Sequence, residues 1–401
     1  MTSSLLPTYA RFNLAFERGE GAWLYAANGD KYLDFGAGIA VVSVGHSHPH
    51  LVGTLIDQGR KLWHVSNLFE IPQAEKLGAR LVAESFADLV FFTNSGTEAM
   101  EGAIKTARRH QFVSGHPERT RIITFQGAFH GRTLAAVAAG GNPKYLEGFG
   151  PPLDGFDQVP FGDLAAAEAA ITPQTAAILI EPVQGEGGIR VAAPDFLEAL
   201  RALCDQHGLL LIFDEVQSGM GRTGKLFAYQ HSRATPDIMG LAKGIGGGFP
   251  LGAFLTTRAV GLCMTPGTHG TTYGGNPLAT AVGNAVLDVI LAAGFLGHVA
   301  ETGAALGRGL GELQTRYPDV IEAVRGQGLM FGLRVVGPVG EFVKAALAEK
   351  LITIPASDNV VRLLPPLTVD EAEVALALTR LNAAAEKLSA ERAKAAQRGA
   401  A

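Results

Sequence analysis

Two residues with reactive side chains stand at the ends of short apolar runs. Lys243 follows residues 238–241 and is followed at once by glycines, and Asp214 closes the run 209–213. In an α/β sheet such strand ends meet at one edge, so we expect both side chains to lie there. A lysine amine can bond covalently to an aldehyde, and an aspartate can keep a pyridine nitrogen protonated. The pair therefore predicts a site for pyridoxal 5'-phosphate.

A third run, residues 89–92, is followed by small residues that open a predicted helix. Backbone N–H groups in the first turn of a helix are free, and the helix dipole favours a negative charge there. Gly96 and Thr97 could therefore hold a phosphate. The same segment also fits an ordinary helix cap with Glu98 in the first turn.

Phe129 and Arg132 come shortly after a fourth apolar run, residues 121–125. The aromatic ring could stack on a planar cofactor, and the guanidinium could bind a substrate carboxylate through paired hydrogen bonds. Each residue alone also fits a simpler role, because most Phe side chains lie in cores and most Arg side chains in solvent.

Residues 219–225 match the G-x-G-x-x-G pattern and nearly match a P-loop, and they raise a nucleotide-binding module as an alternative. A P-loop needs Ser or Thr after the lysine, where this chain has Leu226. A dinucleotide site places its first glycine directly at a strand end, whereas five residues intervene here. We expect instead a glycine-rich loop that borders the cofactor cleft.

His46, His48 and His50 resemble a metal cluster, but no nearby cysteine or carboxylate completes a ligand set and Pro49 suggests a turn. We therefore expect no metal site.

Composition limits the class of protein. The 401 residues are 47% apolar and 18% charged, which is typical of a globular chain with a large core. A net charge of −5 argues against a nucleic-acid partner. Two cysteines cannot build a disulfide framework, which fits a reducing compartment. The first residues lack the pattern of a signal peptide and no run suits a membrane span, so we expect a cytoplasmic protein with no membrane partner.

Short apolar runs alternate with helical patterns after about residue 55. We expect strands at 89–92, 121–125, 176–180, 209–213, 238–241 and 251–256, with helices at 97–110 and 194–207 between them. This alternation predicts an α/β protein with a mostly parallel sheet covered by helices.

The two ends of the chain differ from this middle part. Residues 28–30 are a hairpin turn signal between strands at 21–25 and 31–35. A helix at 278–293 leads into a smaller C-terminal unit. There we expect strands at 329–335, 351–354 and 360–364, helices at 340–349 and 370–393, and a frayed helix end over the last dozen residues.

Taken in order, the motifs closely resemble the class III aminotransferases, and within them the acetylornithine aminotransferases. The resemblance covers nearly the whole chain, in residues 19–25, 94–99, 130–133, 181–188, 213–224, 270–277 and 362–367. It implies the pyridoxal-phosphate transferase fold type I. A large domain (56–295) would hold a mostly parallel seven-stranded sheet, and residues 1–55 and 296–401 would form a smaller α+β domain.

The resemblance also implies roles around the cofactor ring. Lys243 would bind the cofactor covalently, Asp214 would pair with the ring nitrogen, and Gln217 would reach the ring hydroxyl. Val216 would pack on one ring face and Phe129 on the other.

At the phosphate, Gly96 and Thr97 would be joined by Thr272 from the neighbouring subunit. The resemblance therefore implies a homodimer with shared active sites.

For the substrates, Arg132 and Thr271 would contact the carboxylate end of acetylornithine. Arg362 would bind the α-carboxylate of glutamate or 2-oxoglutarate, and Glu186 would pair with Arg362 between the half-reactions.

The implied activity is transfer of the ω-amino group of N2-acetyl-L-ornithine to 2-oxoglutarate. The products are N-acetyl-L-glutamate 5-semialdehyde and L-glutamate, as in arginine biosynthesis.

Succinylornithine, succinyl-diaminopimelate, ornithine and 4-aminobutyrate enzymes are alternatives. Ornithine enzymes usually carry a tyrosine in the stretch that corresponds to residues 36–42, and its absence here favours an acylated substrate, acetylated or succinylated. A related isomerase or decarboxylase could share the cofactor site, but Arg362 favours transamination.

Overall fold

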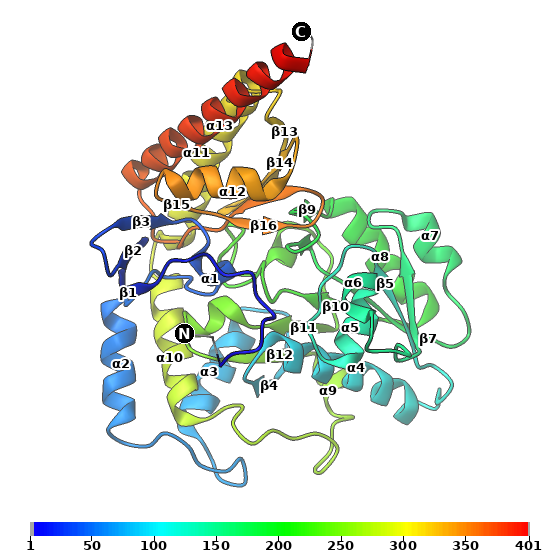
Figure 1. Cartoon of the computed structure of the whole chain (residues 1–401). Helices are drawn as coiled ribbons and strands as arrows, with labels where there is room; N and C mark the ends of the chain where they lie inside the picture. The colour runs from blue at the N-terminus through cyan, green and yellow to red at the C-terminus, as the bar shows by residue number, and fades with distance from the viewer. Residues whose placement is uncertain (1–3, 400–401) are drawn as a thin grey trace.

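The structure, a computed structural model, describes residues 4–399. Its largest element is a seven-stranded sheet (Figure 1). Across the sheet the strands are β4 (Leu89–Thr93), β12 (Gly252–Thr256), β11 (Ile238–Leu241), β10 (Leu210–Asp214), β7 (Thr175–Ile180), β5 (Arg121–Phe125) and β6 (Phe156–Val159). Only β12 runs antiparallel to its neighbours, so the other six strands end at the same edge.

Helices cover both faces of this sheet. On one face α4 (Gly96–Val113) buries an apolar stripe against β5, β7, β10 and β11. On the other face α8 (Pro194–His207) buries Leu197 and Leu200 in the largest core cluster. Because helices lie on both sides, β7 and β10 are buried along their whole length, which explains their continuous apolar sequences.

Two further four-stranded sheets involve the ends of the chain. One contains β1 (Phe16–Glu20), β2 (Trp23–Ala26), β3 (Lys31–Asp34) and β15 (Leu351–Ile352). The other contains β13 (Ile321–Gln327), β14 (Met330–Val335), β17 (Val360–Leu363) and β16 (Ile354–Ala356). Since β3 pairs with β15, the N-terminal segment shares a sheet with the C-terminal unit. The domain boundaries at 55/56 and 295/296 remain our proposal.

The remaining elements connect these sheets. A short hairpin is formed by β8 (Val183–Gln184) and β9 (Arg190–Val191). The helices are α1 (Ala37–Ala40), α2 (Pro49–Gly59), α3 (Pro72–Ala83), α5 (Leu134–Gly140), α6 (Pro143–Leu146), α7 (Leu164–Ala169), α9 (Arg258–Gly261), α10 (Pro277–Ile290), α11 (Phe295–Arg316), α12 (Val339–Ala348) and α13 (Glu371–Gly399), with 3-10 turns η1 (Ala228–His231) and η2 (Lys243–Gly246).

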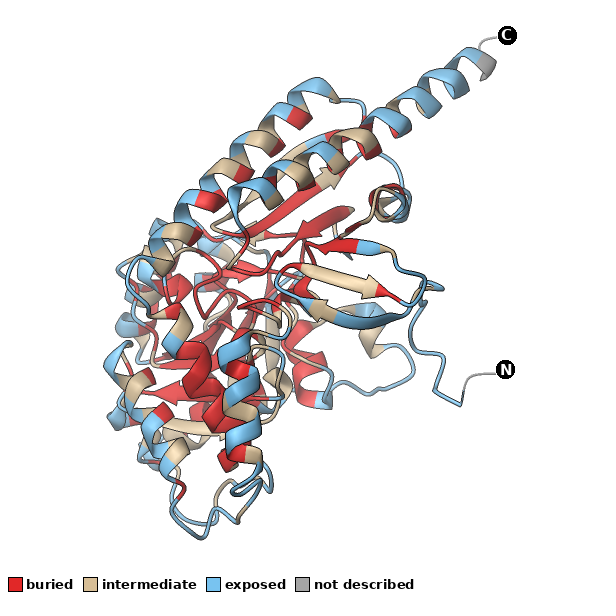
Figure 2. Cartoon of the chain, turned by 90° about the vertical axis from the view of Figure 1, so that its left-hand side faces the viewer, coloured by how far each residue is buried: buried red, intermediate tan, exposed pale blue. Residues whose placement is uncertain are grey.

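Burial follows this layering. Figure 2 shows buried residues in the central strands and in α10, whereas the outer helices are buried on one side only. The last turns of α13 project beyond the body of the molecule (Figure 2). Within residues 4–399 no single helix is long and apolar enough to cross a membrane; α10 and α11 meet the length and composition criteria only as a pair bent by 69°.

Most of the predicted elements are confirmed. The six strands and two helices predicted for the middle of the chain lie within a few residues of their expected positions, and the hairpin at 28–30 joins β2 to β3. The predicted fold class, with a mostly parallel seven-stranded sheet and smaller α+β parts, is also confirmed.

Four predictions about elements differ from the structure. Five strands were not expected, namely β1, β6, β8, β9 and β13, and β6 carries polar residues that break its apolar pattern. The strand expected at 351–354 is two strands, β15 and β16, which pair in different sheets on either side of Thr353. Pro49 begins α2 rather than a turn, because its ring suits the first helical position. Helix α13 reaches Gly399, and the end of the frayed segment (400–401) lies outside the described residues.

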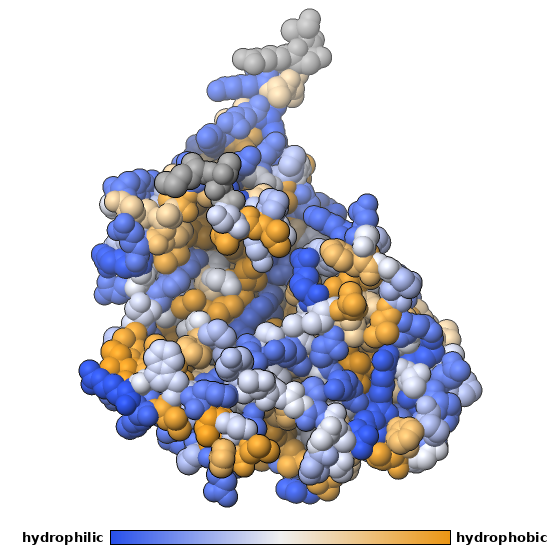
Figure 3. All heavy atoms as spheres, turned by 60° about the horizontal axis from the view of Figure 1, so that its bottom comes forward, coloured by the Kyte–Doolittle hydropathy of each residue, from blue (hydrophilic) through white to orange (hydrophobic). Residues whose placement is uncertain are grey.

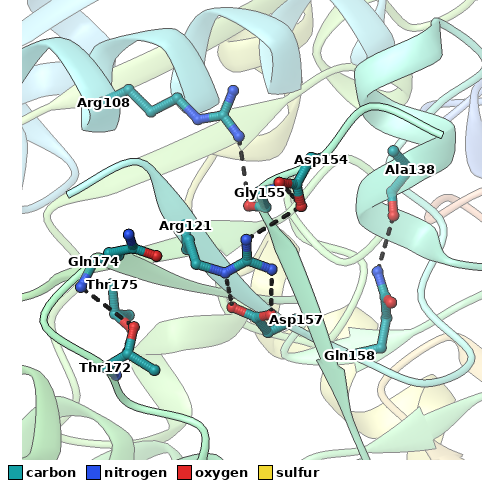
Figure 4. A network of polar contacts seen from close by, with 10 residues as sticks. All are labelled: Arg108, Arg121, Ala138, Asp154, Gly155, Asp157, Gln158, Thr172, Gln174 and Thr175. Atoms are coloured by element: carbon teal, nitrogen blue, oxygen red, sulfur yellow. Dashed lines mark hydrogen bonds and ion pairs between the residues drawn. The ribbon is translucent and has the colours of Figure 1, made fainter. Parts of the chain in front are cut away.

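Charged residues fix the edge strand β6. The Arg121 guanidinium donates to both Asp157 carboxylate oxygens, at 2.9 and 2.6 Å, and to Asp154 at 3.1 Å (Figure 4). From α4, Arg108 donates to the carbonyl of Gly155 at 3.4 Å. These contacts hold β6 against β5 and place charge along an otherwise unpaired sheet edge.

We predict that Asp157→Asn lowers the free energy of unfolding by about 1 kcal/mol, because a partly buried, two-point charged contact is lost. The change in stability is measured from the midpoint of urea unfolding, provided that the slope of the transition is the same in both proteins. Asp154→Asn is the matched control: its side chain is 90% exposed, and we expect little change. Equal effects of the two variants would contradict the role assigned to the bidentate pair.

Candidate active site

The carboxyl ends of the parallel strands surround a cavity of about 430 Å³. Lys243 follows β11, Asp214 ends β10, and Gly96 follows β4. Nine of the residues with predicted site roles line this cavity: Gly96, Thr97, Phe129, Arg132, Glu186, Asp214, Val216, Gln217 and Lys243.

Lys243 begins the 3-10 turn η2 in an unusual conformation. Its φ of 49° lies in the left-handed region that favours glycine, so the surrounding fold must hold the backbone there. Part of that support comes from buried Ser43, whose hydroxyl donates to the Gly244 carbonyl at 2.9 Å. Among residues 4–399 the Lys243 amine has no hydrogen-bond partner, and burial lowers its pKa to about 8. The site therefore makes the neutral, nucleophilic amine far easier to reach than it is for an exposed lysine.

Asp214 is buried and held by two hydrogen bonds. One carboxylate oxygen accepts from His130 Nδ1 at 2.8 Å, and the other accepts from the Val216 backbone N–H at 3.0 Å. His130 is also buried. No spacing in the sequence signals this contact, because residues 130 and 214 come from different strand ends. The arrangement fixes a carboxylate at the cavity wall.

The N-terminus of α4 opens on the cavity. Ser95 caps the helix by accepting from the Glu98 N–H at 3.4 Å, and Gly96 and Thr97 supply its first two residues. A Cβ atom at Gly96 would lie 2.8 Å from a Val216 methyl group, so only glycine lets the two strand ends approach this closely. The free N–H groups and the helix dipole form a site for an anion.

Phe129, which lines the cavity, forms an aromatic pair with Tyr145. The Phe129 ring meets Tyr145 edge to face, with centroids 6.0 Å apart. The Arg132 guanidinium lies 3.9 Å above the Tyr145 ring and 5.5 Å from the Phe129 ring. Stacking therefore orients a cation beside the cavity. Tyr145 belongs to the short helix α6 and was not predicted from the sequence.

Glu186 and Arg362 form a two-point ion pair. Arg362 Nη1 donates to one Glu186 oxygen at 2.6 Å, and Nη2 donates to the other at 3.2 Å. Arg362 is only 1% exposed and also contacts Gln217 Oε1 at 3.4 Å. A fully buried cation beside the cavity is thus covered by one carboxylate.

Two predicted site residues lie away from this cavity in the single chain. Thr271 and Thr272 belong to the loop before α10, and Thr271 accepts a hydrogen bond from the Gly274 N–H at 3.0 Å. Thr271 lines a separate cavity of about 560 Å³ together with Asn67. Thr272 is exposed.

The expectation that residues 219–225 border the cofactor cleft is wrong. None of them lines the cavity; Arg222 is buried and donates to the carbonyls of Leu329 and Pro365. The glycines allow close packing of this turn against the C-terminal unit. No helix follows it directly, so the geometry of a P-loop or dinucleotide site is absent from these residues.

The side chains of His46 and His50 do not converge but contact different carboxylates. His46 contacts Asp34 at 2.8 Å, and His50 contacts Asp288 at 2.9 Å. Within residues 4–399 no group of three His, Cys, Asp or Glu side chains is placed to hold a metal ion.

The groups that do converge fit pyridoxal 5'-phosphate. An unpartnered lysine amine suits its aldehyde, a buried carboxylate suits its ring nitrogen, and a helix N-terminus suits its phosphate. Gly96 lets this helix start lie against Val216, which also lines the cavity.

Comparison with known proteins agrees with this geometry. The family model described as aminotransferase class-III matches residues 7–385. Acetylornithine aminotransferase of Agrobacterium fabrum is 62% identical over 390 residues, covering 97% of this chain and 98% of the relative. The structure resembles the crystal structure of ornithine aminotransferase from Toxoplasma gondii with a TM-score of 0.93, 31% identity, and coverage of 97% and 94%. It resembles that of N-acetylornithine aminotransferase from Stenotrophomonas maltophilia with a TM-score of 0.84, 38% identity, and coverage of 96% and 98%.

The chain therefore belongs to the class III aminotransferases, which are pyridoxal-phosphate-dependent transaminases. Within that family it is similar over nearly its whole length to proteins named acetylornithine aminotransferase.

We predict that the rate of cofactor attachment to the cofactor-free protein rises with pH and levels off above about 8. A lysine with a lowered pKa of about 8 is mostly neutral there, whereas a solvent-exposed lysine would be mostly protonated until about pH 10.4. The growth of the long-wavelength absorbance band after adding pyridoxal phosphate at different pH values measures this. N-α-acetyl-lysine under the same conditions is the control, and an inflection near 10.4 for the protein would contradict a desolvated amine.

Proposed function

We propose that this chain transfers the ω-amino group of N2-acetyl-L-ornithine to 2-oxoglutarate, which yields N-acetyl-L-glutamate 5-semialdehyde and L-glutamate. The observation that carries this proposal is the Glu186–Arg362 ion pair beside the Lys243 amine. An arginine that can be covered or uncovered suits an enzyme that must accept an ω-amine and then an α-keto dicarboxylate. The names of the similar proteins support the choice of acetylornithine.

When bound, pyridoxal phosphate supplies an aldehyde that captures the substrate amine and a ring that accepts electrons from the substrate C–H bond. Lys243 holds the cofactor until the substrate amine takes its place. The Lys243 amine, once free, would accept the proton from the substrate carbon that bears the amine and would later give a proton back. A pKa of about 8 suits this exchange, because the amine can be neutral when it takes the proton and charged when it gives it back.

Asp214 holds the proton on the ring nitrogen, which makes the ring a better electron acceptor. The Nδ1–H of His130 and the N–H of Val216 hold this carboxylate at the cavity wall, where it would meet the ring nitrogen. Gly96 and Thr97 bind the phosphate through the start of α4. Val216 and Phe129 would pack on the two ring faces, and Gln217 would reach the ring hydroxyl.

Substrate contacts divide between two ends of the cavity. Arg132, which is oriented by stacking on Tyr145, would bind the carboxylate of the acylated amino acid. Thr271 lies away from this cavity in the single chain, so its contact with the same carboxylate would have to come from the neighbouring chain of the proposed dimer. In the second half-reaction Glu186 releases Arg362, and the guanidinium binds the α-carboxylate of 2-oxoglutarate. Val41, in the stretch that lacks a polar aromatic residue, lines the cavity and leaves it apolar for an acyl group.

We also propose a homodimer in which Thr272 of one chain completes the phosphate site of the other. In the single chain Thr272 is exposed and does not line the cavity. Large apolar side chains stand exposed on the loops of the same face, among them Trp63, Leu68, Phe69 and Tyr273. Figure 3 turns this side of the molecule toward the viewer, and apolar side chains are visible between polar ones. A holoenzyme that sediments at the mass of one chain, 42.0 kDa, would contradict this assembly.

We place the protein in the cytoplasm. Both cysteines are free and buried, which fits a reducing compartment. Burial raises the pKa of Cys204 to about 12, so this thiol is unreactive.

The donor identity is tested by adding N2-acetyl-L-ornithine to the holoenzyme without a keto acid. We expect the long-wavelength cofactor band to be replaced by the spectrum of pyridoxamine phosphate, and L-ornithine to react at least about tenfold more slowly. If the band forms but persists with the acetylated donor, the transaminase fold stands and the substrate is wrong.

We predict that Glu186→Ala raises the use of α-amino donors relative to N2-acetyl-L-ornithine by about tenfold, because Arg362 is then permanently uncovered. The ratio of kcat/KM for L-glutamate to that for the ω-amino donor measures the change. Glu198→Ala, which breaks the exposed pair with Arg233, is the control and leaves the ratio unchanged. An unchanged ratio in Glu186→Ala would contradict the switch.

A further inference from the structure

A third carboxylate at the cavity, besides Asp214 and Glu186, has no role in the chemistry described above. Glu181 follows β7, lies between the strand ends that carry Asp214 and Phe129, lines the cavity and is only 5% exposed. A buried carboxylate needs hydrogen-bond partners, since its desolvation is otherwise costly. The partners of Glu181 therefore indicate what it does.

Both partners are backbone groups that support site residues. One oxygen accepts from the Phe129 N–H at 3.1 Å, and the other accepts from the Gly185 N–H at 3.4 Å. Phe129 is the proposed ring-stacking residue, and Gly185 directly precedes Glu186. One side chain thus joins the loop after β5 to the loop that carries the switch carboxylate.

The space around these contacts is tight. A Cβ atom at Gly185 would lie 2.2 Å from Gln217 Oε1, so the Gly185 backbone is pressed against the proposed ring-hydroxyl contact. A small movement of this loop would therefore shift both Glu186 and Gln217.

We propose that Glu181 is a positioning residue that sets the ring-stacking side chain and the Glu186–Arg362 switch at a fixed distance from each other. It acts through backbone groups and does not touch the reacting atoms. The inference rests on the proposed function, since it assigns no substrate of its own.

The chain contains a matched control at the next strand. Glu215, one residue after Asp214, is 1% exposed and also accepts from two backbone N–H groups, those of Ala228 at 2.5 Å and Tyr229 at 2.7 Å. Burial raises the pKa of both carboxyls, that of Glu215 to about 7 and that of Glu181 well above its ordinary value, with the charge of Asp214 adding to the effect. Glu215 does not line the cavity.

The test compares Glu181→Gln with Glu215→Gln in the holoenzyme. A glutamine keeps the size but has one acceptor oxygen where two N–H donors point, so each variant loses one backbone hydrogen bond. For Glu181→Gln we expect a changed visible circular dichroism band of the bound cofactor. We also expect one of the two half-reactions to slow by about tenfold or more, because a displacement of about 1 Å in a site can cost about a hundredfold.

We expect Glu215→Gln and Glu181→Gln to lower the unfolding temperature by similar amounts. In Glu215→Gln, however, the cofactor band and the half-reaction rates should stay within about twofold of the wild type. Equal changes in both variants, or wild-type spectra and rates in Glu181→Gln, would overturn the proposal.

A measurement on the wild type keeps the proposal testable if Glu181→Gln does not fold. Hydrogen exchange at the Phe129 and Gly185 amides should be slow, because both donate to a buried carboxylate. Exchange at the rate of exposed loop amides would overturn the proposal. Failure of the wild type to react with N2-acetyl-L-ornithine would contradict the proposed function alone, since the exchange rates and the cofactor band do not depend on that donor.

Discussion

The parallel direction of six strands is the constraint on which the rest of this structure depends. Because β4, β5, β7, β10 and β11 all end at one edge, a helix N-terminus, an aromatic ring, two carboxylates and a lysine meet at one cavity although they are far apart in the sequence. Only β12 runs in the opposite direction, and it lies between β4 and β11 in the sheet. The C-terminal unit adds Arg362, which lies within β17 and pairs with Glu186 at the cavity wall.

Desolvation gives these convergent groups their chemistry. The same burial that lowers the pKa of Lys243 to about 8 raises that of Glu181, because desolvation disfavours the charged form of both groups in the cavity that they share with Asp214. Asp214 is held by the His130 ring and a backbone N–H, which suits a carboxylate that must face a positive ring nitrogen. Arg362 needs its own partner for the same physical reason, and Glu186 supplies one that can move away when a substrate carboxylate replaces it.

Much of the fold could be predicted from the sequence, because the buried strands are short apolar runs. Residues of a distinct kind mark where these runs end: Asp214, Lys243, or the small residues that begin helix α4. The edge strand β6 could not be predicted, since its pairing depends on Arg121 meeting Asp157 across the sheet and not on an apolar pattern. In the site, the roles assigned to Lys243, Asp214 and Arg362 followed from motifs. The hydrogen bonds of His130 and Glu181 did not, because they join separate strand ends and backbone groups that no spacing encodes. The glycine pattern at 219–225 was misleading for a related reason: close packing against Leu367 and Ala300 requires glycine, and so does ligand binding.

The central claim is that the chain moves an ω-amino group to 2-oxoglutarate. The most direct measurement follows the nitrogen atom itself, with N2-acetyl-L-ornithine labelled with nitrogen-15 only at its ω-amine. The holoenzyme is mixed with this donor and unlabelled 2-oxoglutarate, and the glutamate formed is analysed by mass spectrometry. We predict that the glutamate carries the label and that N-acetyl-L-glutamate 5-semialdehyde appears in equal amount. Unlabelled glutamate, or no glutamate from an enzyme that holds its cofactor, would contradict the account.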